Sequence, residues 1–308
     1  MLFTIPQICG IINPTTPGLC PGARRYPALK IIQLKNYTMT QMMGFFIVTD
    51  EGHVIAIDGG NKADTEGWLR RVEAITGSRT GKLDAWFMTH PHDDHYGVFI
   101  TVSAMARAGQ PVPQVTQFCW CPQPDSIGDN QRIFANQIVE LNAELAVTPF
   151  PLHPVSVGET YTFGSLTVEV LRIADPAITE DCFNNSSVVL RLTEKRPGKP
   201  DFVFIVLGDL GVRGGFQLLD MYPDGLRADA VQMAHHGQNG CTREVYEAIR
   251  PRFAFWTTPD WLWTNTIPGG EPGKGPFATL LTRSWMEALG TEAVRPTDED
   301  VVFDTALV

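Results

Sequence analysis

Five of the seven histidines in this 308-residue chain lie in two short blocks. His90, His92 and His95 fall within THPHDDHYG, and His235 and His236 fall within MAHHG. Core packing does not gather histidines in this way, whereas neutral imidazole beside carboxylate is a donor set that zinc, manganese and iron accept in proteins. The two blocks therefore predict a metal site.

The first block begins where an apolar run ends. Residues 82–88 (KLDAWFM) indicate a buried strand, and Pro91 has a fixed φ that helps the backbone to turn sharply after it. The turn would allow four closely spaced donors to surround metal: His90, His92, Asp94 and His95. His90 and His92 would face one position and the other two a second position about 3.5–4 Å away, the usual spacing of two-metal hydrolases.

A structural alternative exists for the same block. His90 and His92 could end the strand, and Asp94 could cap a helix over residues 96–108. Capping needs one Asp and no imidazole, so we favour the metal interpretation.

The pattern His-x-His-x-Asp-His, with the apolar strand before it and an Asp-Gly-Gly turn at residues 58–60, resembles the metallo-β-lactamase superfamily of metal-dependent hydrolases. The resemblance runs from Leu29 to Asp304. It implies an α/β (α+β) fold, a four-layer αββα sandwich with the metals at the edge between two sheets. It also implies that Asp209 bridges the metals and that His235, with His236 beside it, is the last ligand.

One stretch departs from the superfamily pattern. Many members supply a third histidine to the first metal from a Gly-His-Thr loop, but residues 181–192 (DCFNNSSVVLRL) contain none, and Asp181, Asn184 or Asn185 takes its neighbourhood. Together with His-His-Gly, this stretch resembles the hydrolase domain of bacterial competence DNA-uptake channel proteins, which are phosphodiesterase-like. The departure implies a weaker first metal site, and oxygen-richer sites shift preference from zinc toward manganese.

Three residues are candidates for supporting roles. Asp58 ends VIAID and precedes two glycines, so it suits a carboxylate that holds a ligating histidine in its tautomer; the alternative is an acceptor in a tight turn. Trp261 and Trp263 lie in a stretch rich in glycine and proline that is long enough to be a lid. They would either wall the substrate or fill the core, and the sequence leaves both open.

Together these residues predict a metal-dependent hydrolase. One or two divalent ions, zinc first and manganese or iron as alternatives, would supply a hydroxide at neutral pH. Asp94 would orient that hydroxide, Asn185 and His236 would stabilise developing charge, and His236 or metal-bound water would protonate the leaving group. We expect a phosphodiester or similar small substrate. The alternatives are a carboxylic ester, lactone or β-lactam, and a catalytically silent metal-binding domain; an iron enzyme with a flavin partner is disfavoured because no flavin domain is attached.

Composition sets the remaining expectations. Lys plus Arg is 24 against 34 Asp plus Glu, and this net charge of -10 disfavours extended nucleic acid as a partner and favours a small molecule. No low-complexity linker divides residues 28–308, which we expect to form one domain, with residues 1–27 as an N-terminal extension. Six cysteines without CxxC spacing, no secretion signal and no membrane-spanning run predict a cytoplasmic protein without a membrane partner. Nothing indicates an oligomeric state.

Apolar patterning predicts an antiparallel start followed by alternating strands and helices. Strands are expected at residues 29–34, 43–48, 54–57, 161–163, 166–173, 187–192, 202–207, 228–233 and 253–256. Helices are expected at residues 63–75, 96–108, 133–145, 216–221 and 244–250.

Overall fold

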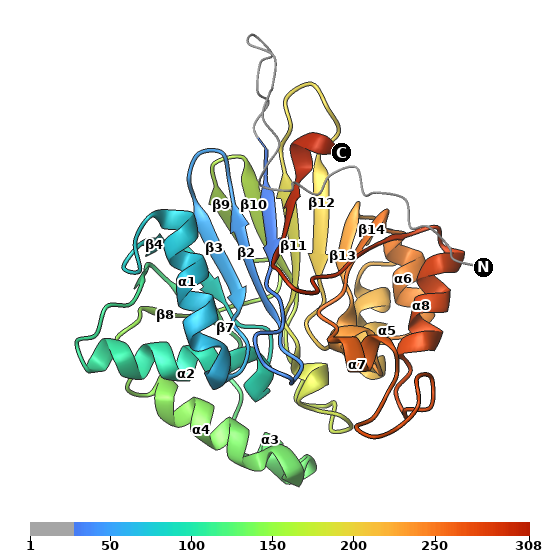
Figure 1. Ribbon diagram of the computed structural model, residues 1–308, viewed down its shortest axis with the longest axis horizontal. Helices are drawn as coiled ribbons and strands as arrows, with labels where there is room; N and C mark the ends of the chain where they lie inside the picture. Colours follow the sequence, from blue (N-terminus) through green and yellow to red (C-terminus); the bar gives the residue numbers. More distant parts are fainter. Residues whose placement is uncertain (1–27) are drawn as a thin grey trace.

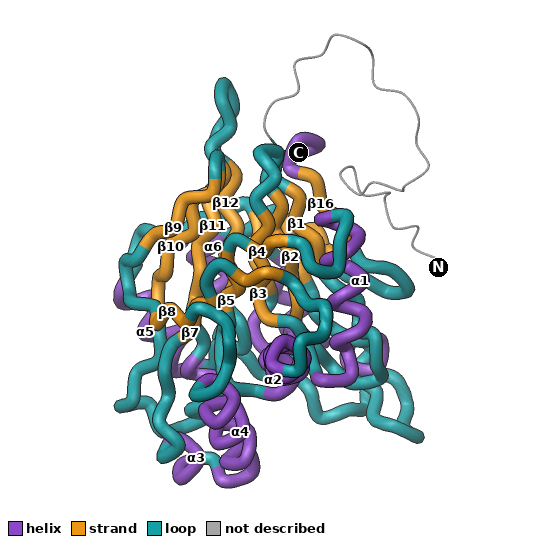
Figure 2. Tube along the Cα trace, turned by 90° about the vertical axis from the view of Figure 1, so that its left-hand side faces the viewer, coloured by secondary structure: helices purple, strands orange, loops and turns teal. Residues whose placement is uncertain are grey.

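The computed structural model describes residues 28–308, and the predicted extension at residues 1–27 lies outside the described residues. Within residues 28–308, two seven-stranded sheets lie face to face, and helices cover the outer face of each (Figure 1). Figure 2 shows the sandwich from the side, with the strands of residues 160–206 beside those of residues 30–58. The predicted αββα order of layers is confirmed.

The first sheet combines antiparallel and parallel pairing. Its order is β16 (Val301–Asp304), β1 (Lys30–Gln33), β2 (Gly44–Val48), β3 (Val54–Asp58), β5 (Ala85–Phe87), β7 (Phe118–Trp120) and β8 (Leu152–Pro154). Strands from β3 onward are parallel, and their crossovers run through η1 (Lys62–Asp64), α1 (Thr65–Thr76), α2 (Asp93–Arg107), α3 (Ile127–Asn130), η2 (Arg132–Phe134) and α4 (Ala135–Leu145). These helices form the outer layer on this side.

The second sheet has the order β15 (Glu292–Val294), β14 (Phe253–Phe255), β13 (Ala230–Gln232), β12 (Phe202–Val206), β11 (Val189–Glu194), β10 (Leu166–Arg172) and β9 (Thr160–Phe163). Its connections include η3 (Asn184–Ser186), α5 (Val212–Met221), η4 (Ala234–Gly237), α6 (Arg243–Ile249), α7 (Asp260–Trp263) and α8 (Thr279–Ala288). Outside these layers, η5 (Thr305–Leu307) follows β16, and β4 (Lys82–Leu83) pairs with β6 (Gln114–Val115).

Side chains alternate between the two faces of each strand, so the two sheets form three hydrophobic cores: one between the sheets and one between each sheet and its helices. In β2, Phe45 faces the core between the sheets and Phe46 faces the helices. In β12, Phe204 faces the same central core and Ile205 packs against α5 and α6. Both faces of each sheet are thus covered, so the ends of the central strands are the places where polar side chains can meet.

Two predicted elements differ from the structure near the site. The run 82–88 is two strands, because Asp84 pairs with Val54 through both its backbone N–H and its carboxylate and so displaces β4 from the main sheet. The following helix begins at Asp93, not Tyr96, so its first turn carries two of the predicted donors.

Segments far apart in the sequence complete the first sheet. β16 pairs antiparallel with β1, and the Leu29 N–H donates to Thr305 Oγ1, 276 positions away. The sequence patterns did not predict β15 or β16.

Among the described residues, no helix is both long and apolar enough to cross a lipid bilayer.

Candidate metal centre

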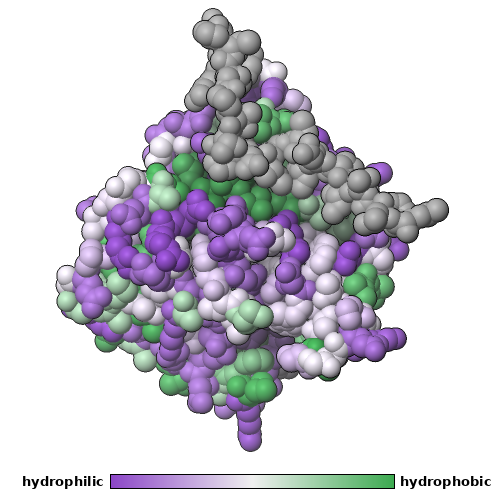
Figure 3. Space-filling view, viewed as in Figure 1, coloured by the Kyte–Doolittle hydropathy of each residue, from purple (hydrophilic) through white to green (hydrophobic). Residues whose placement is uncertain are grey.

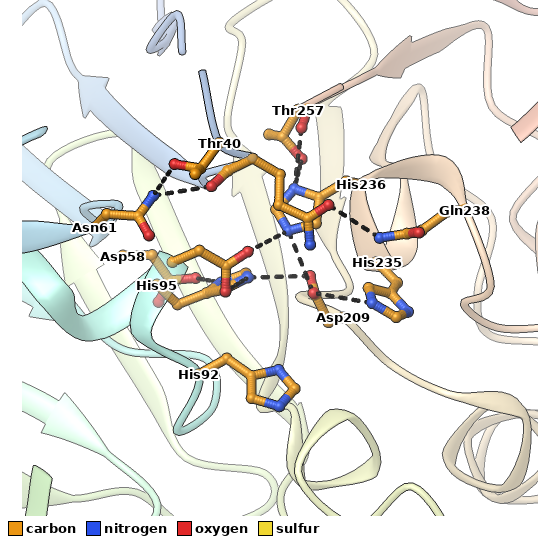
Figure 4. Close-up of polar contacts among 12 residues, drawn as sticks. Thr40, Asp58, Asn61, His92, His95, Asp209, His235, His236, Gln238 and Thr257 are labelled. Carbon is orange, nitrogen blue, oxygen red and sulfur yellow. Dashed lines mark hydrogen bonds and ion pairs between the residues drawn. The ribbon is translucent and has the colours of Figure 1, made fainter. Parts of the chain in front are cut away.

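Six buried side chains meet at one edge of the sandwich. They come from the loop after β5, the first turn of α2, the end of β12 and η4, and Figure 4 shows several of them pointing toward one another. The six residues are His90, His92, Asp94, His95, Asp209 and His236.

Four of these residues form what we call the four-donor group: Asp94, His95, Asp209 and His236. One donor atom from each lies within 4.8 Å of the others. His236 Nε2 is 3.0 Å from Asp94 Oδ2 and 3.4 Å from Asp209 Oδ2, and His95 Nε2 is 3.2 Å from Asp209 Oδ1. Two imidazoles and two carboxylates at this spacing can hold one divalent cation.

The three-donor group consists of His90, His92 and Asp209, again within 4.8 Å of one another. His90 Nε2 lies 3.8 Å from Asp209 Oδ2 and 3.0 Å from His92 Nδ1. Asp209 belongs to both groups, and the bridging role that the resemblance implied for it stays a prediction.

Buried polar atoms with incomplete hydrogen bonding at the two donor groups fit a bound cation. His92 Nε2 is buried and has no hydrogen-bond partner, and His95 Nε2 and Asp209 Oδ1 are buried and form no hydrogen bond beyond their 3.2 Å contact with each other. Buried polar atoms are almost always paired, and these three belong to the two donor groups. Nitrogen and carboxylate oxygen atoms of this kind fit zinc or a similar divalent ion.

The electrostatics of the four-donor group agree with this. Burial by itself would lower the pKa of His95 and His236, but the negative charges of Asp209 and Asp94 have a larger effect. They hold the pKa of His95 well above its usual value and raise that of His236 to about 9. Burial would likewise raise the pKa of Asp94 and Asp209, but His95 and His236 hold it below the usual range. Two protons balance two carboxylates here, and one divalent cation supplies the same charge.

The three-donor group is electrostatically different. Burial lowers the pKa of His92 to about 4 and that of His90 well below its usual value. Both rings are therefore neutral at pH 7, which is the form in which imidazole binds metals.

Asp58 lies behind His95 and contacts the ring of this candidate ligand. Its Oδ2 is 2.7 Å from His95 Nδ1, and Thr89 donates to the same carboxylate through its N–H (2.8 Å) and its hydroxyl (2.6 Å). The His95 Nδ1–H donates to Asp58, which leaves Nε2 free to face Asp209. The hydroxyl of Thr89 also lies 3.1 Å from His90 Nδ1, a supporting contact that the sequence reasoning missed.

The order of the paired histidines was predicted wrongly. His235, His236 and Gly237 all have positive φ (50°, 54° and 78°), so the chain leaves β13 through a left-handed turn that directs His236 inward. The His236 Nδ1–H donates to the Thr257 carbonyl (3.0 Å), and its Nε2 faces the carboxylates. His235 Nε2 is 4.0 Å from Asp209, and its side chain is 19% exposed. The predicted proton-donor role of His236 does not fit, because both of its nitrogens are committed.

Asn185 does not face the centre either. Its Oδ1 accepts from the Gly214 N–H at the start of α5, and its Nδ2 donates to the Glu180 carbonyl. The predicted charge-stabilising role is therefore wrong, because the amide is used to hold backbone. Ser187, two residues on, was missed; its Oγ accepts from the Asp209 N–H at 3.0 Å and so fixes the bridging residue.

The two predicted substrate-wall tryptophans differ. Trp263 packs edge-on against Trp256, with the Arg283 guanidinium 3.9 Å from its ring centroid, so it belongs to the helix layer. Trp261 donates from Nε1 to the Met39 carbonyl and thereby tethers the loop before β2. A substrate contact by Trp261 stays a prediction.

Solved structures share this architecture at low sequence identity. The metallo-β-lactamase fold protein YhfI from Bacillus subtilis matches with a TM-score of 0.53 and 10% identity, over 91% of this chain and 100% of that one. Unliganded yeast PDE1 matches with a TM-score of 0.54 and 10% identity, over 90% and 99%. A mutant of the CmlA beta-hydroxylase matches at 0.50 and 14% identity, over 89% of this chain and 53% of its own.

These likenesses show that the chain has the metallo-β-lactamase fold. No family model and no curated protein matches the sequence.

Proposed function

We propose that this protein is a metal-dependent hydrolase with a binuclear centre. The observation that carries the proposal is the position of Asp209, which belongs to both donor groups and whose buried Oδ1 forms no hydrogen bond beyond its 3.2 Å contact with His95 Nε2. His90, His92 and Asp209 would hold one ion, and Asp94, His95, His236 and Asp209 the other. Zinc is the first candidate, because all donors are imidazole nitrogen or carboxylate oxygen.

The chain's own residues supply position and charge. Divalent ions in these groups would lower the pKa of a bound water to about 7 and so provide the nucleophile. Asp94 contacts His236 Nε2 through Oδ2, and its Oδ1 lies 3.9 Å from His95 Nε2. In this position its carboxylate would orient the bound water. His235, at the partly exposed edge, is the imidazole placed to hydrogen-bond the leaving group.

The substrate we propose is a small phosphodiester. Two divalent ions would neutralise its charge, and the net charge of -10 opposes a long polyanion. The likeness of the 181–192 stretch and His-His-Gly to the hydrolase domain of DNA-uptake channel proteins supports the same substrate class.

A carboxylic ester or lactone is the second candidate, for a specific reason. Among the described residues, no Lys or Arg forms an ion pair with the two donor carboxylates, Asp94 and Asp209, whose charged partners are all histidines. Without a Lys or Arg to pair with its charge, an anionic substrate loses more hydration free energy on entering the site than a neutral ester does.

The test uses Asp209→Ala and Asp94→Ala. Both variants should lose hydrolysis of chromogenic phosphodiesters and lactones while keeping the circular dichroism spectrum of the wild type, and Asp209→Ala should also lose bound metal by elemental analysis. Undiminished turnover by either purified, metal-loaded variant would refute the assignment. Whether the wild type hydrolyses the phosphodiesters or the lactones faster decides between the two substrate classes.

A further inference from the structure

We infer that Arg172 is a positioning residue of the candidate metal centre: its guanidinium holds the main chain of Ser187, and the Ser187 hydroxyl holds Asp209. The inference rests on the proposed function and adds to it a buried charged side chain that acts through another residue. Without this guanidinium, the residue common to both donor groups should lose its position, and the site should lose affinity for zinc.

A β-bulge at the end of β10 determines where the Arg172 side chain lies. Val168 and Val170 face the core between the sheets, so regular alternation would direct residue 172 into the same apolar core. The register between β10 and β11 shifts between Val170 and Arg172, and both Leu171 and Arg172 lie on the face of the sheet that α5 covers. Bulges often re-aim a side chain in this way next to active sites.

Arg172 is both buried and charged. Figure 3 shows that hydrophilic residues cover most of the face in view, where charged groups are usually found, whereas Arg172 is only 1% exposed. Burial lowers the pKa of Arg172 to about 10, so the guanidinium keeps its proton at pH 7.

The hydrogen bonds of the guanidinium go to neutral groups. Nε donates to Gln217 Oε1 on α5 (2.9 Å), and Nη1 donates to the Ser187 carbonyl (3.2 Å). Gln217 Nε2 donates in turn to Asp175 Oδ2 (2.7 Å), and Arg172 Nη2 has no partner among the described residues. A buried charge without a direct ion pair is costly, and an apolar side chain of similar size would fill the space at less cost. What an apolar side chain cannot supply is the hydrogen bond to Ser187.

Ser187 connects this support to the site. Its Oγ accepts from the Asp209 N–H at 3.0 Å, and the N–H of Val188 donates to the Thr89 carbonyl at 2.8 Å. A Cβ on Gly208 would lie 2.9 Å from both Ser187 Oγ and Thr89 Cβ, so the three segments are tightly packed. A displacement of Ser187 would therefore move Asp209 and also the loop after β5, which carries two donors of the three-donor group.

The competing explanation is that Arg172 only stabilises the packing of α5 on the sheet. In that case its loss would lower the free energy of unfolding and leave the zinc affinity of the folded protein unchanged. A positioning role predicts a loss of zinc affinity in the folded protein, and it predicts local loosening of the main chain at Asp209 even without metal.

The experiment measures zinc affinity by competition with a chromophoric chelator, on protein whose circular dichroism spectrum matches the wild type. Groups that support metal ligands typically contribute 10–100-fold to affinity, so Arg172→Met and Ser187→Ala should each weaken zinc binding by about that factor. Arg172→Lys keeps the charge but not the planar fork of donors, so it should lose less than Arg172→Met. Should Arg172→Met not fold, Arg172→Lys and Ser187→Ala decide.

Ser186→Ala is the matched control. The Ser186 hydroxyl is also buried and donates to a main-chain carbonyl, that of Phe183 (2.6 Å), but it does not contact Asp209. Its replacement should leave the zinc affinity at the wild-type value.

Hydrogen exchange provides a second readout that needs neither metal nor turnover. In the metal-free protein, Arg172→Lys and Ser187→Ala should accelerate amide exchange in residues 207–211 more than in β2. If the wild type binds no zinc or hydrolyses neither substrate class, the proposed function fails, and faster exchange confined to residues 207–211 still upholds the link from Arg172 to Asp209. Wild-type zinc affinity in the Arg172 and Ser187 variants, or equal acceleration of exchange in both segments, would overturn the inference and leave the proposed function standing.

Discussion

Asp58 connects the metal centre to the first sheet through one short contact with His95. Carboxylates that orient ligating histidines typically contribute 10–100-fold to metal affinity. We therefore expect Asp58→Ala to weaken the tighter-bound zinc by about that factor, measured by competition with a chromophoric chelator.

Asp58→Asn is the informative companion. Asn tolerates the positive φ of 52° at this position, so the backbone is preserved while the amide replaces the carboxylate that accepts from His95. Both variants should lose zinc affinity, and Asp58→Ala should lose more stability. Wild-type affinity in Asp58→Ala would show that His95 needs no such partner.

The protonation of the four-donor group predicts a pH dependence of metal binding. His95 and His236, with raised pKa values, hold protons at pH 7 in the metal-free protein, and a cation must displace them. Apparent zinc affinity should therefore rise with pH up to about 9, the pKa of His236. A flat profile in a buffered calorimetric titration would contradict the charge balance proposed for this group.

The same pKa shift predicts a pH dependence of stability. A raised pKa stabilises the fold below the usual value of 6.5, and that contribution is lost as pH rises through about 9. The metal-free protein should therefore lose Tm between these limits, while the zinc-loaded protein should lose less because the ion supplies the charge. Scanning calorimetry of both forms in matched buffers measures this.

At the scale of single residues, types and spacing located the centre but not every orientation. The HxHxDH block and the Gly-Asp after β12 are local signals, and their residues do converge. The choice between His235 and His236 depended on three successive left-handed residues, for which Gly237 was the sole local hint. Asn185 misled because an amide at a strand entry can serve a substrate or a backbone, and spacing does not distinguish them.

The left-handed turn of η4 is the element that directs His236, and Gly237 makes it possible. A Cβ on Gly237 would lie 2.3 Å from the Trp256 ring, whereas Gly77 has the same φ of 78° and open space around it. Gly77→Ala should therefore cost about 1–2 kcal/mol from backbone conformation alone. Gly237→Ala should cost clearly more and also reduce zinc binding, as measured by denaturant unfolding and metal content.

Equal destabilisation by Gly237→Ala and Gly77→Ala would show that η4 can shift without disturbing the site. Most of the longer strands and helices were predicted, since they follow apolar periodicity, but α3, α7, α8, β15 and β16 were not. The short η2 was missed, because Ile133 and Phe134 read as the start of α4 and the contact of Phe134 with His92 crosses many residues of sequence.

At the scale of the whole molecule, the unequal donor groups predict two classes of metal. The four-donor group has one more protein ligand and one more carboxylate than the three-donor group. Stepwise treatment of the purified protein with a chelator should therefore remove one equivalent easily and the second slowly, with activity lost in the first step. Simultaneous loss of both ions would contradict this order.

The layered fold was predictable from the resemblance carried by the HxHxDH block, and the apolar character of the strands agrees with it because both faces of each sheet are covered. The pairing of β16 with β1 was not predictable, because the register between strands that are distant in sequence produces no local sequence pattern.

That pairing has a consequence for biosynthesis. While a ribosome is still making residues 301–304, β1 presents a bare hydrogen-bonding edge to the crowded cell, and this edge is protected when its distant partner arrives. Shortened chains that end before Val301 should therefore aggregate during expression, even though they retain all the histidines of the candidate metal centre. Chaperones should associate with the nascent chain until late in its synthesis.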